Sequence, residues 1–399
     1  MLIKLALRNI FRNRRRSAIT MAVIVFGAVG LILFGGYKAV TFRGLRESTI
    51  RGRTGHLQLF GLGHSKGSQK PLEHALTDVT AMRARIEKDP RVQSTAAQIT
   101  LMGLISNGDK SETFVATAVE PEKDRLMRGQ TVIEGTPLPD AETDAVTLGK
   151  GLAKSMNVKT GDYVTLMSPT VSGSLNAIDV RVAGIFQTGV KELDERAVKM
   201  PLAGAQQLLQ TSKVEKLLVF LHETETTGAV QAEIEKMKLP VEMKSWSELA
   251  SFYHQVVMLY NGIFGFLGII VSAIVVFSVA NTIVMSIFER TREIGTLMAV
   301  GVTRGRVWRM FFLEGLLTGT LGGFLGVAAG ALVAFLINSG DIMLPPPPGY
   351  TVGYKLTILL QPPVLIAAFL ISVVTSTLSS IIPAFKASRL KVVDALGHI

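Results

Sequence analysis

Four long stretches of this sequence contain no Asp, Glu, Lys or Arg, and they limit the folds that the chain can adopt. An α-helix needs about 20 mainly apolar residues to cross the roughly 30 Å hydrocarbon layer of a bilayer. The uncharged stretches are long enough to do so: they are residues 17–37, 249–288, 315–340 and 356–385. With 48% hydrophobic and 18% charged residues, the composition also departs from that of soluble chains. The sequence therefore predicts an α-helical membrane protein with four transmembrane helices.

The segments between these stretches define the predicted layout. About two hundred residues, 41–250, separate the first span from the second. Their alternating strand and helix patterns predict a large extracytoplasmic α+β domain, with two lobes divided between residues 120 and 145. The spans are expected at residues 17–40, 255–288, 310–340 and 361–385. The other segments are a basic amphipathic arm (1–16), a cytoplasmic elbow (289–309), a proline-rich outer loop (341–360) and a cytoplasmic tail (386–399).

Turn residues place several elements inside the outer domain. Asn107-Gly108-Asp109 lies between two strand-like segments, 99–106 and 113–119, as in a β-hairpin. Asp78 should begin an amphipathic helix that ends at Ile86. Further helices are expected at residues 149–156 and 226–237, and further strands at 163–167, 180–186, 197–200 and 216–221.

Basic residues set the expected orientation, because Lys and Arg in short flanks stay on the cytoplasmic side. Residues 1–16 carry six basic and no acidic side chains, and residues 289–314 and 386–399 each carry a net charge of +2. Residues 41–254, by contrast, contain 26 basic and 26 acidic side chains. Both termini are therefore predicted on the cytoplasmic side, and the large domain outside.

Two other interpretations of this charge pattern are less favoured. A net charge of +11 would suit nucleic-acid binding, but the basic residues flank apolar helices and do not cover a soluble face with interleaved aromatics. A cleaved signal peptide would have an apolar core of about 7 to 15 residues and a small-residue cleavage site. The first apolar stretch is longer and no such site follows it. We therefore expect an uncleaved first helix, and we expect this chain to have membrane lipid and no nucleic acid as a partner.

The sequence offers no recognisable catalytic, cofactor-binding or metal-binding residues. It has no cysteine, and its six histidines lack zinc-site spacing, so they are interpreted as surface residues. Acidic residues cluster at Glu192, Asp194 and Glu195, where a solvated loop is favoured over a cation site. Near Gly149-Lys150 the spacing lacks a glycine and a hydroxyl residue that a P-loop needs. If ATP drives this protein, another chain binds it.

Local rules predict the shape of residues 289–301. The helix of the second span should continue through Val300, with Gly301 as a left-handed stop and Thr303 as the N-cap of a helix that enters the third span. The elbow also carries an apolar stripe at i, i+3 and i+4, together with charged side chains. The stripe consists of Ile294, Leu297 and Met298, and the charged residues are Glu289, Arg290 and Glu293.

Glycines repeat at every fourth position along the third span. One series contains Gly315, Gly319 and Gly323, and a second series includes Gly326. Small residues at this spacing let helix backbones approach closely in a membrane. The partner is either a neighbouring helix of the same chain or a second copy, and the intramolecular alternative is at least as well supported.

The segment from Glu289 to Gly301 resembles the E-R-x-x-E-I-G-x-x-x-A-x-G signature of the FtsX-like permeases, the MacB and LolC/LolE class of ABC transporter. Residues 7–16 resemble the opening R-N-x-x-R-N-x-x-R of this family, and residues 383–396 resemble its closing P-A-x-x-A-x-R…A-L. Residues 144–162 resemble its outer core domain. The resemblance thus extends over nearly the whole chain.

This resemblance implies a dimeric permease in the bacterial cytoplasmic (inner) membrane, with a MacB-like periplasmic core. The chain would pair with a second copy or a paralogue and dock a separate cytoplasmic ABC ATPase, which holds ATP and Mg²⁺. It would bind no cofactor and would not be an enzyme by itself. Its movements would extract or export a lipoprotein, lipid, peptide or drug. The residues implied in ATPase coupling are Glu289, Arg290, Glu293, Ile294, Gly295, Leu297, Met298, Ala299 and Gly301.

Two other functions remain open at this point. An FtsX-like signal transducer would activate a periplasmic partner, such as a cell-wall hydrolase, without transport. An ATP-independent channel or carrier is the third alternative, and the lack of ionisable residues in the spans counts against it. Stimulation of the ATPase by a cargo would separate the first two functions.

Overall fold

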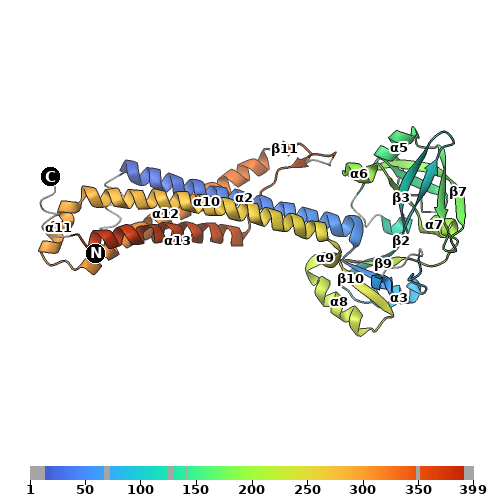
Figure 1. The fold of residues 1–399 in the computed structure, drawn as a ribbon, viewed down its shortest axis with the longest axis horizontal. Coiled ribbons are helices and arrows are strands. Elements are labelled where there is room, and N and C mark those ends of the chain that lie inside the picture. The colour runs from blue at the N-terminus through green and yellow to red at the C-terminus, as the bar shows by residue number, and fades with distance from the viewer. Residues whose placement is uncertain (1–13, 67–71, 125–129, 141, 347–350, 391–399) are drawn as a thin grey trace. The chain divides into compact units, whose positions relative to one another are not determined.

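The computed structural model describes residues 14–66, 72–124, 130–140, 142–346 and 351–390 (Figure 1). The chain divides into two compact units. The first consists of Met1–Arg43, Val256–Leu344 and Lys355–Ile399, and the second of Gly44–Gln255 and Pro345–Tyr354. Most of the predicted arm and tail lies outside the described residues.

Four long helices form the first unit: α2 (Arg14–Thr49), α10 (Ser251–Glu289), α12 (Arg304–Ser339) and α13 (Pro362–Ser388). All four are long and apolar enough to cross a membrane, which confirms the predicted number of spans. Two of them are longer than expected, since the last six residues of α2 and the first five of α10 belong to the second unit. α2 continues into a π-helical turn, η1 (Ile50–Thr54), and an ion pair of 3.3 Å between Glu47 and Arg51 supports this extension.

The glycines of α12 are packing positions. One series faces α13, and Gly326 faces α2, so that a Cβ atom added at any of these glycines would lie 2.5 to 3.2 Å from a neighbouring atom. The contacts are Gly315 with Ser380, Gly319 with Ser376, Gly323 with Phe369, and Gly326 with Ala28. The hydroxyl of Ser376 also donates to the carbonyl oxygen of Gly315 at 2.8 Å. Of the two predicted alternatives, the structure therefore shows packing within one chain.

The other side of α2 contacts α10. The hydroxyl oxygens of Thr20 and Thr282 are 2.5 Å apart, and the rings of Phe34 and Phe264 have centroids 5.5 Å apart. Beyond these contacts α10 is largely exposed, and only 11% of its most apolar 18-residue segment is buried. Large apolar side chains such as Phe266 therefore remain available to lipid or to another chain.

A ten-stranded sheet forms the centre of the second unit, with the order β10-β1-β9-β2-β3-β8-β5-β7-β4 and with β6 paired to β2 and β7. Its strands are β1 (Leu57–Gly61), β2 (Val92–Ser106), β3 (Ser111–Val119), β4 (Thr131–Gly135), β5 (Ala145–Gly149), β6 (Tyr163–Pro169), β7 (Leu175–Gln187), β8 (Ala197–Pro201), β9 (Lys216–Leu221) and β10 (Val241–Ser245). Its helices are α3 (Val79–Ile86), α4 (Pro121–Asp124), α5 (Lys150–Met156), α6 (Lys191–Asp194), α7 (Leu202–Leu209), α8 (Thr227–Lys236) and α9 (Trp246–Leu249), with the 3-10 turns η2 (His64–Lys66) and η3 (Thr224–Thr226).

The predicted lobe boundary between residues 120 and 145 is wrong. Two main hydrophobic clusters fill the second unit, but one draws on residues 99–209 and the other on residues 57–97 and 214–234. Figure 1 shows α3, α8 and β10 in one part of the unit, and α5, β3 and β7 in the other. The long strand β2 contributes to both clusters and pairs with both β9 and β3. The sheet is therefore continuous where sequence patterns alone suggested a break.

The predicted proline-rich loop contains the short strands β11 (Met343–Leu344) and β12 (Tyr354–Lys355). The side chain of Asn338 closes its base, because it donates to the carbonyl oxygen of Ile358 at 2.9 Å and accepts from the N–H of Ile358 at 2.8 Å. Residues 347–350, including two of its prolines, lie outside the described residues.

Candidate coupling site

The segment between α10 and α12 forms a separate short helix, α11 (Thr291–Ala299). The predicted continuous helix through Val300 is wrong, because the backbone breaks at Arg290 (φ −119°). The Thr291 hydroxyl donates to the carbonyl oxygens of Ile287 and Phe288, at 3.0 and 3.1 Å. Side-chain bonds of this kind weaken the helical ladder slightly and often bend a helix, and this one lies at the break.

α11 ends in a Schellman motif. The N–H of Gly301 donates to the carbonyl oxygen of Met298 at 3.1 Å, and the N–H of Val302 donates to that of Leu297 at 3.0 Å. Gly301 has a φ of +99°, which confirms the predicted left-handed stop. Thr303 is the N-cap residue of α12, as predicted, and has extended backbone, although its side chain makes no capping hydrogen bond.

The side chains of α11 divide into a packed face and an exposed face. Ile294 is 1% exposed and Gly295 is buried, and Met298 packs partly against the same cluster, which also contains Val307. Leu297, predicted in the same stripe, is 44% exposed. The buried face of α11 is thus turned toward the side of Met298 and away from that of Leu297.

The charged residues Arg290 and Glu293 differ in their exposure to solvent. Arg290 was expected on the charged surface, but it is only 4% exposed, with Nε 3.8 Å from a carboxylate oxygen of Glu293. The Glu293 side chain itself is 58% exposed. Arg292, Leu297 and Ala299 are also exposed, as is Val300 just after the helix, so that α11 has an apolar outward face that carries one acidic and one basic side chain. Such a face suits contact with another protein.

Glu289 makes an interaction that sequence patterns did not reveal. The guanidinium of Arg16 donates to both of its carboxylate oxygens, at 3.1 and 2.5 Å. The first turn of α2 is therefore joined to the last residue of α10, immediately before α11.

The described residues contain no group of three or more His, Asp and Glu side chains that could hold a metal ion. Within the predicted acidic cluster, Asp194 is buried and accepts hydrogen bonds from the N–H and hydroxyl of Thr188, at 2.8 and 2.7 Å. Its role is therefore structural. One histidine differs from the prediction of surface positions, since His56 is fully buried.

A chain with four apolar helices, an α+β domain between the first and second, and a short amphipathic helix between the second and third has the architecture of a multi-pass membrane permease. Two family models match this chain. The FtsX-like permease C-terminal model matches residues 265–392, and the MacB-like periplasmic core domain matches residues 17–237. The chain belongs to the FtsX-like permeases with a MacB-like periplasmic core, and it is a permease subunit of a type VII ABC transporter.

The chain is also similar to individual proteins. The chain is 24% identical over 329 residues to the lipoprotein-releasing system transmembrane protein LolC of Xylella fastidiosa, covering 78% of this chain and 79% of LolC. It is 39% identical over 120 residues to the macrolide export ATP-binding/permease protein MacB of Escherichia coli, covering 30% of this chain and 17% of MacB. Comparison with the periplasmic region of MacB from Actinobacillus actinomycetemcomitans gives a TM-score of 0.37 at 13% identity, covering 51% of this chain and 95% of that one.

Proposed function

We propose that a separate cytoplasmic ABC ATPase docks on α11, and that its ATP-driven movements pass along α2 and α10 to the outer domain. There they would drive extraction or export of a lipoprotein, lipid, peptide or drug. The observation that carries this proposal is the exposed face of α11, which is apolar and carries Arg292 and Glu293; the helix is anchored by the buried Ile294 and lies between two long apolar helices. ATP and Mg²⁺ would be bound by the ATPase.

The charge of the helix flanks and the exposed side chains of α10 support an orientation and an assembly for this permease. The basic flanks support cytoplasmic termini and an outer position for the large domain. Similarity to LolC supports an inner-membrane location with that domain in the periplasm. The exposed apolar length of α10 supports pairing with a second copy or a paralogue. α2 and α10 are the natural transmission elements, because each continues without a helix break from the first unit into the second.

Copurification tests the proposal. The tagged chain is extracted from its native membrane into nanodiscs, and copurifying proteins are identified by mass spectrometry and assayed for ATP hydrolysis. We expect an ABC ATPase in equal stoichiometry, and its loss with Glu293→Lys. Asp109→Lys, an exposed charge reversal in the β2–β3 hairpin, is the matched control and should retain it. Recovery of the chain without an ATPase would contradict the proposal.

Cargo stimulation distinguishes transport from signalling. ATP hydrolysis by the purified complex is measured with a triacylated lipopeptide, a phospholipid vesicle and a macrolide as separate probes. Stimulation by one of them supports a transport cargo of that class. Stimulation only by a soluble periplasmic hydrolase would favour the signal-transducer alternative.

A further inference from the structure

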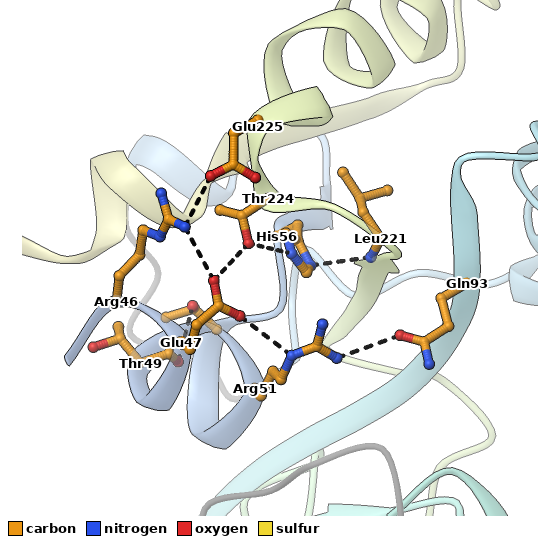
Figure 2. A network of polar contacts seen from close by, with 10 residues as sticks. Arg46, Glu47, Thr49, Arg51, His56, Gln93, Leu221, Thr224 and Glu225 are labelled. Atoms are coloured by element: carbon orange, nitrogen blue, oxygen red, sulfur yellow. Dashed lines mark hydrogen bonds and ion pairs between the residues drawn. The ribbon is translucent and has the colours of Figure 1, made fainter. Parts of the chain in front are cut away.

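His56 connects η1 to β1, and both nitrogens of its buried ring make hydrogen bonds (Figure 2). The N–H of Leu221 donates to Nδ1 at 3.0 Å, and Nε2 lies 3.1 Å from the hydroxyl oxygen of Thr224. Because a backbone N–H can only donate, Nδ1 must be the unprotonated acceptor. The proton is therefore on Nε2, which donates to Thr224.

The same chain of hydrogen bonds reaches the end of α2. The Thr224 hydroxyl donates to Oε1 of Glu47 at 2.9 Å. Charged groups surround this point on three elements. Arg46 and Glu47 belong to α2, Arg51 to η1 and Glu225 to η3. Glu47 contacts both arginines, at 3.4 and 3.3 Å, and Arg46 contacts Glu225 at 3.0 Å.

The backbone of His56 adds two further connections. Its N–H donates to the carbonyl oxygen of Val219 in β9 at 2.8 Å, and its carbonyl oxygen accepts from the N–H of Trp246 at 3.0 Å. Trp246 is the first residue of α9, which is fixed by a capping box between Ser245 and Glu248 and is followed at once by α10. His56 thus contacts the sheet, joins the polar residues at the end of α2 through Thr224, and contacts the first residue of α9, the short helix that precedes α10.

We propose that His56 is the positioning residue that joins α2 and α10 to the sheet, and that its protonation opens this joint in acid. The consequence for coupling rests on the proposed function. The joint itself is a property of this chain and can be tested without the ATPase.

Protonation is incompatible with the observed bonding. An imidazolium has two N–H donors, so its Nδ1–H would face the N–H of Leu221 with no acceptor between them. Burial lowers the pKa of His56 from 6.5 to about 4, with Arg51 and Arg46 acting in the same direction and Glu47 and Glu225 opposing it. The ring is therefore neutral at pH 7. Between pH 6.5 and 4 an opened His56 takes up a proton more readily than a closed one, so acid favours opening.

Hydrogen exchange of the full chain in nanodiscs tests the joint. Protection of the Leu221 amide, corrected for intrinsic exchange, should fall roughly tenfold or more between pH 7.5 and pH 5. In His56→Asn the side-chain oxygen can still accept from Leu221 but does not titrate, so this pH dependence should disappear. His222→Asn, at an exposed histidine next to Leu221, should behave as the unmodified chain.

A second variant, Thr224→Val, tests the joint even if His56→Asn does not fold. Thr224→Val removes the link to Glu47 and leaves the bond between Leu221 and His56, so exchange at residues 46–54 should rise at pH 7.5 while the Leu221 amide stays protected. A change of less than twofold in the unmodified chain, or an unaltered pH dependence in His56→Asn, would overturn the joint. Loss of the ATPase from the complex would leave these results unaffected.

Discussion

Arg16 and Glu289 form a bidentate ion pair with N–O distances of 3.1 and 2.5 Å. This pair joins the first turn of α2 to the last residue of α10. The two residues are 273 positions apart in the sequence. Glu289 follows the packed residue Ile287 by two positions and lies immediately before the break at which α11 begins. The ion pair therefore ties the candidate docking helix to both of the helices that enter the outer domain.

A charge exchange tests this pair. The side chains of Arg16 and Glu289 are 29% and 41% exposed, so the interaction should contribute only about 0.5 to 1 kcal/mol. Arg16→Glu and Glu289→Arg should each lower the unfolding midpoint, and the double variant should recover most of the loss. The coupling energy from this cycle should shrink at high salt. Additive losses in the double variant would show that the two side chains do not interact.

Gly301→Ala should disturb α11 through the backbone alone. The added Cβ would meet no atom within 4 Å, but the φ of +99° disfavours a side chain by about 1 to 2 kcal/mol. We expect faster hydrogen exchange in residues 291–302 and weaker retention of the ATPase. Gly305→Ala, which also has open space but lies inside α12, should be neutral or slightly stabilising. Equal effects of the two substitutions would contradict the role given to the turn.

Gly319→Leu should separate α12 from α13. A Cβ at this position would lie 2.7 Å from the Cβ of Ser376, and the longer side chain has nowhere to go without moving a helix. Overpacking of this kind costs about 1 to 3 kcal/mol, and the thermal midpoint in nanodiscs should fall accordingly. Gly262→Leu on α10 meets nothing within 4 Å and should leave the midpoint nearly unchanged. A midpoint unaffected by Gly319→Leu would mean that the two helices do not pack as observed.

Glu242 gives the outer domain a second response to pH. Hydrogen bonds from the Ser65 hydroxyl, and from the N–H groups of Ser65 and Gly63, lower its pKa from 4.5 to about 2. Because the folded pKa is depressed, this contribution to stability is present above pH 4.5 and is lost as pH falls toward 2. Protection of the Gly63 amide should therefore be constant from pH 7 to 5 and should decrease below 4.5. Glu242→Gln should weaken it at neutral pH, and protection unchanged down to pH 3 would contradict this account.

Elements that depend on local signals could be predicted from the sequence. The hairpin around Asn107 is present, with Ser106 opposite Ser111 in the register of β2 and β3. Asp78 caps α3 by accepting from the N–H of Ala81 at 3.1 Å, and β9 has the predicted bounds. In these cases the residues that determine the structure are neighbours in the chain.

Elements that depend on distant partners could not be predicted. β1, β4 and β10 are only five residues long, and β1 is defined by pairing with β9 and β10. The burial of His56 depends on Leu221 and Thr224, 165 and 168 positions away. The break at Arg290, next to the bond from the Thr291 hydroxyl to Ile287, has no clear pattern in the sequence.

Site-specific crosslinking tests the docking of an ATPase on α11 most directly. The chain has no cysteine, so Val300→Cys, at a side chain that is 81% exposed, introduces a single reactive group at the end of α11. Leu175→Cys, at a 72% exposed position of the outer domain, is the control. With a short bifunctional maleimide–photoreactive reagent, the account predicts that Val300→Cys crosslinks to a copurified ABC ATPase and that Leu175→Cys does not. An ATPase that copurifies but crosslinks only from Leu175→Cys, or from neither position, would contradict docking on α11.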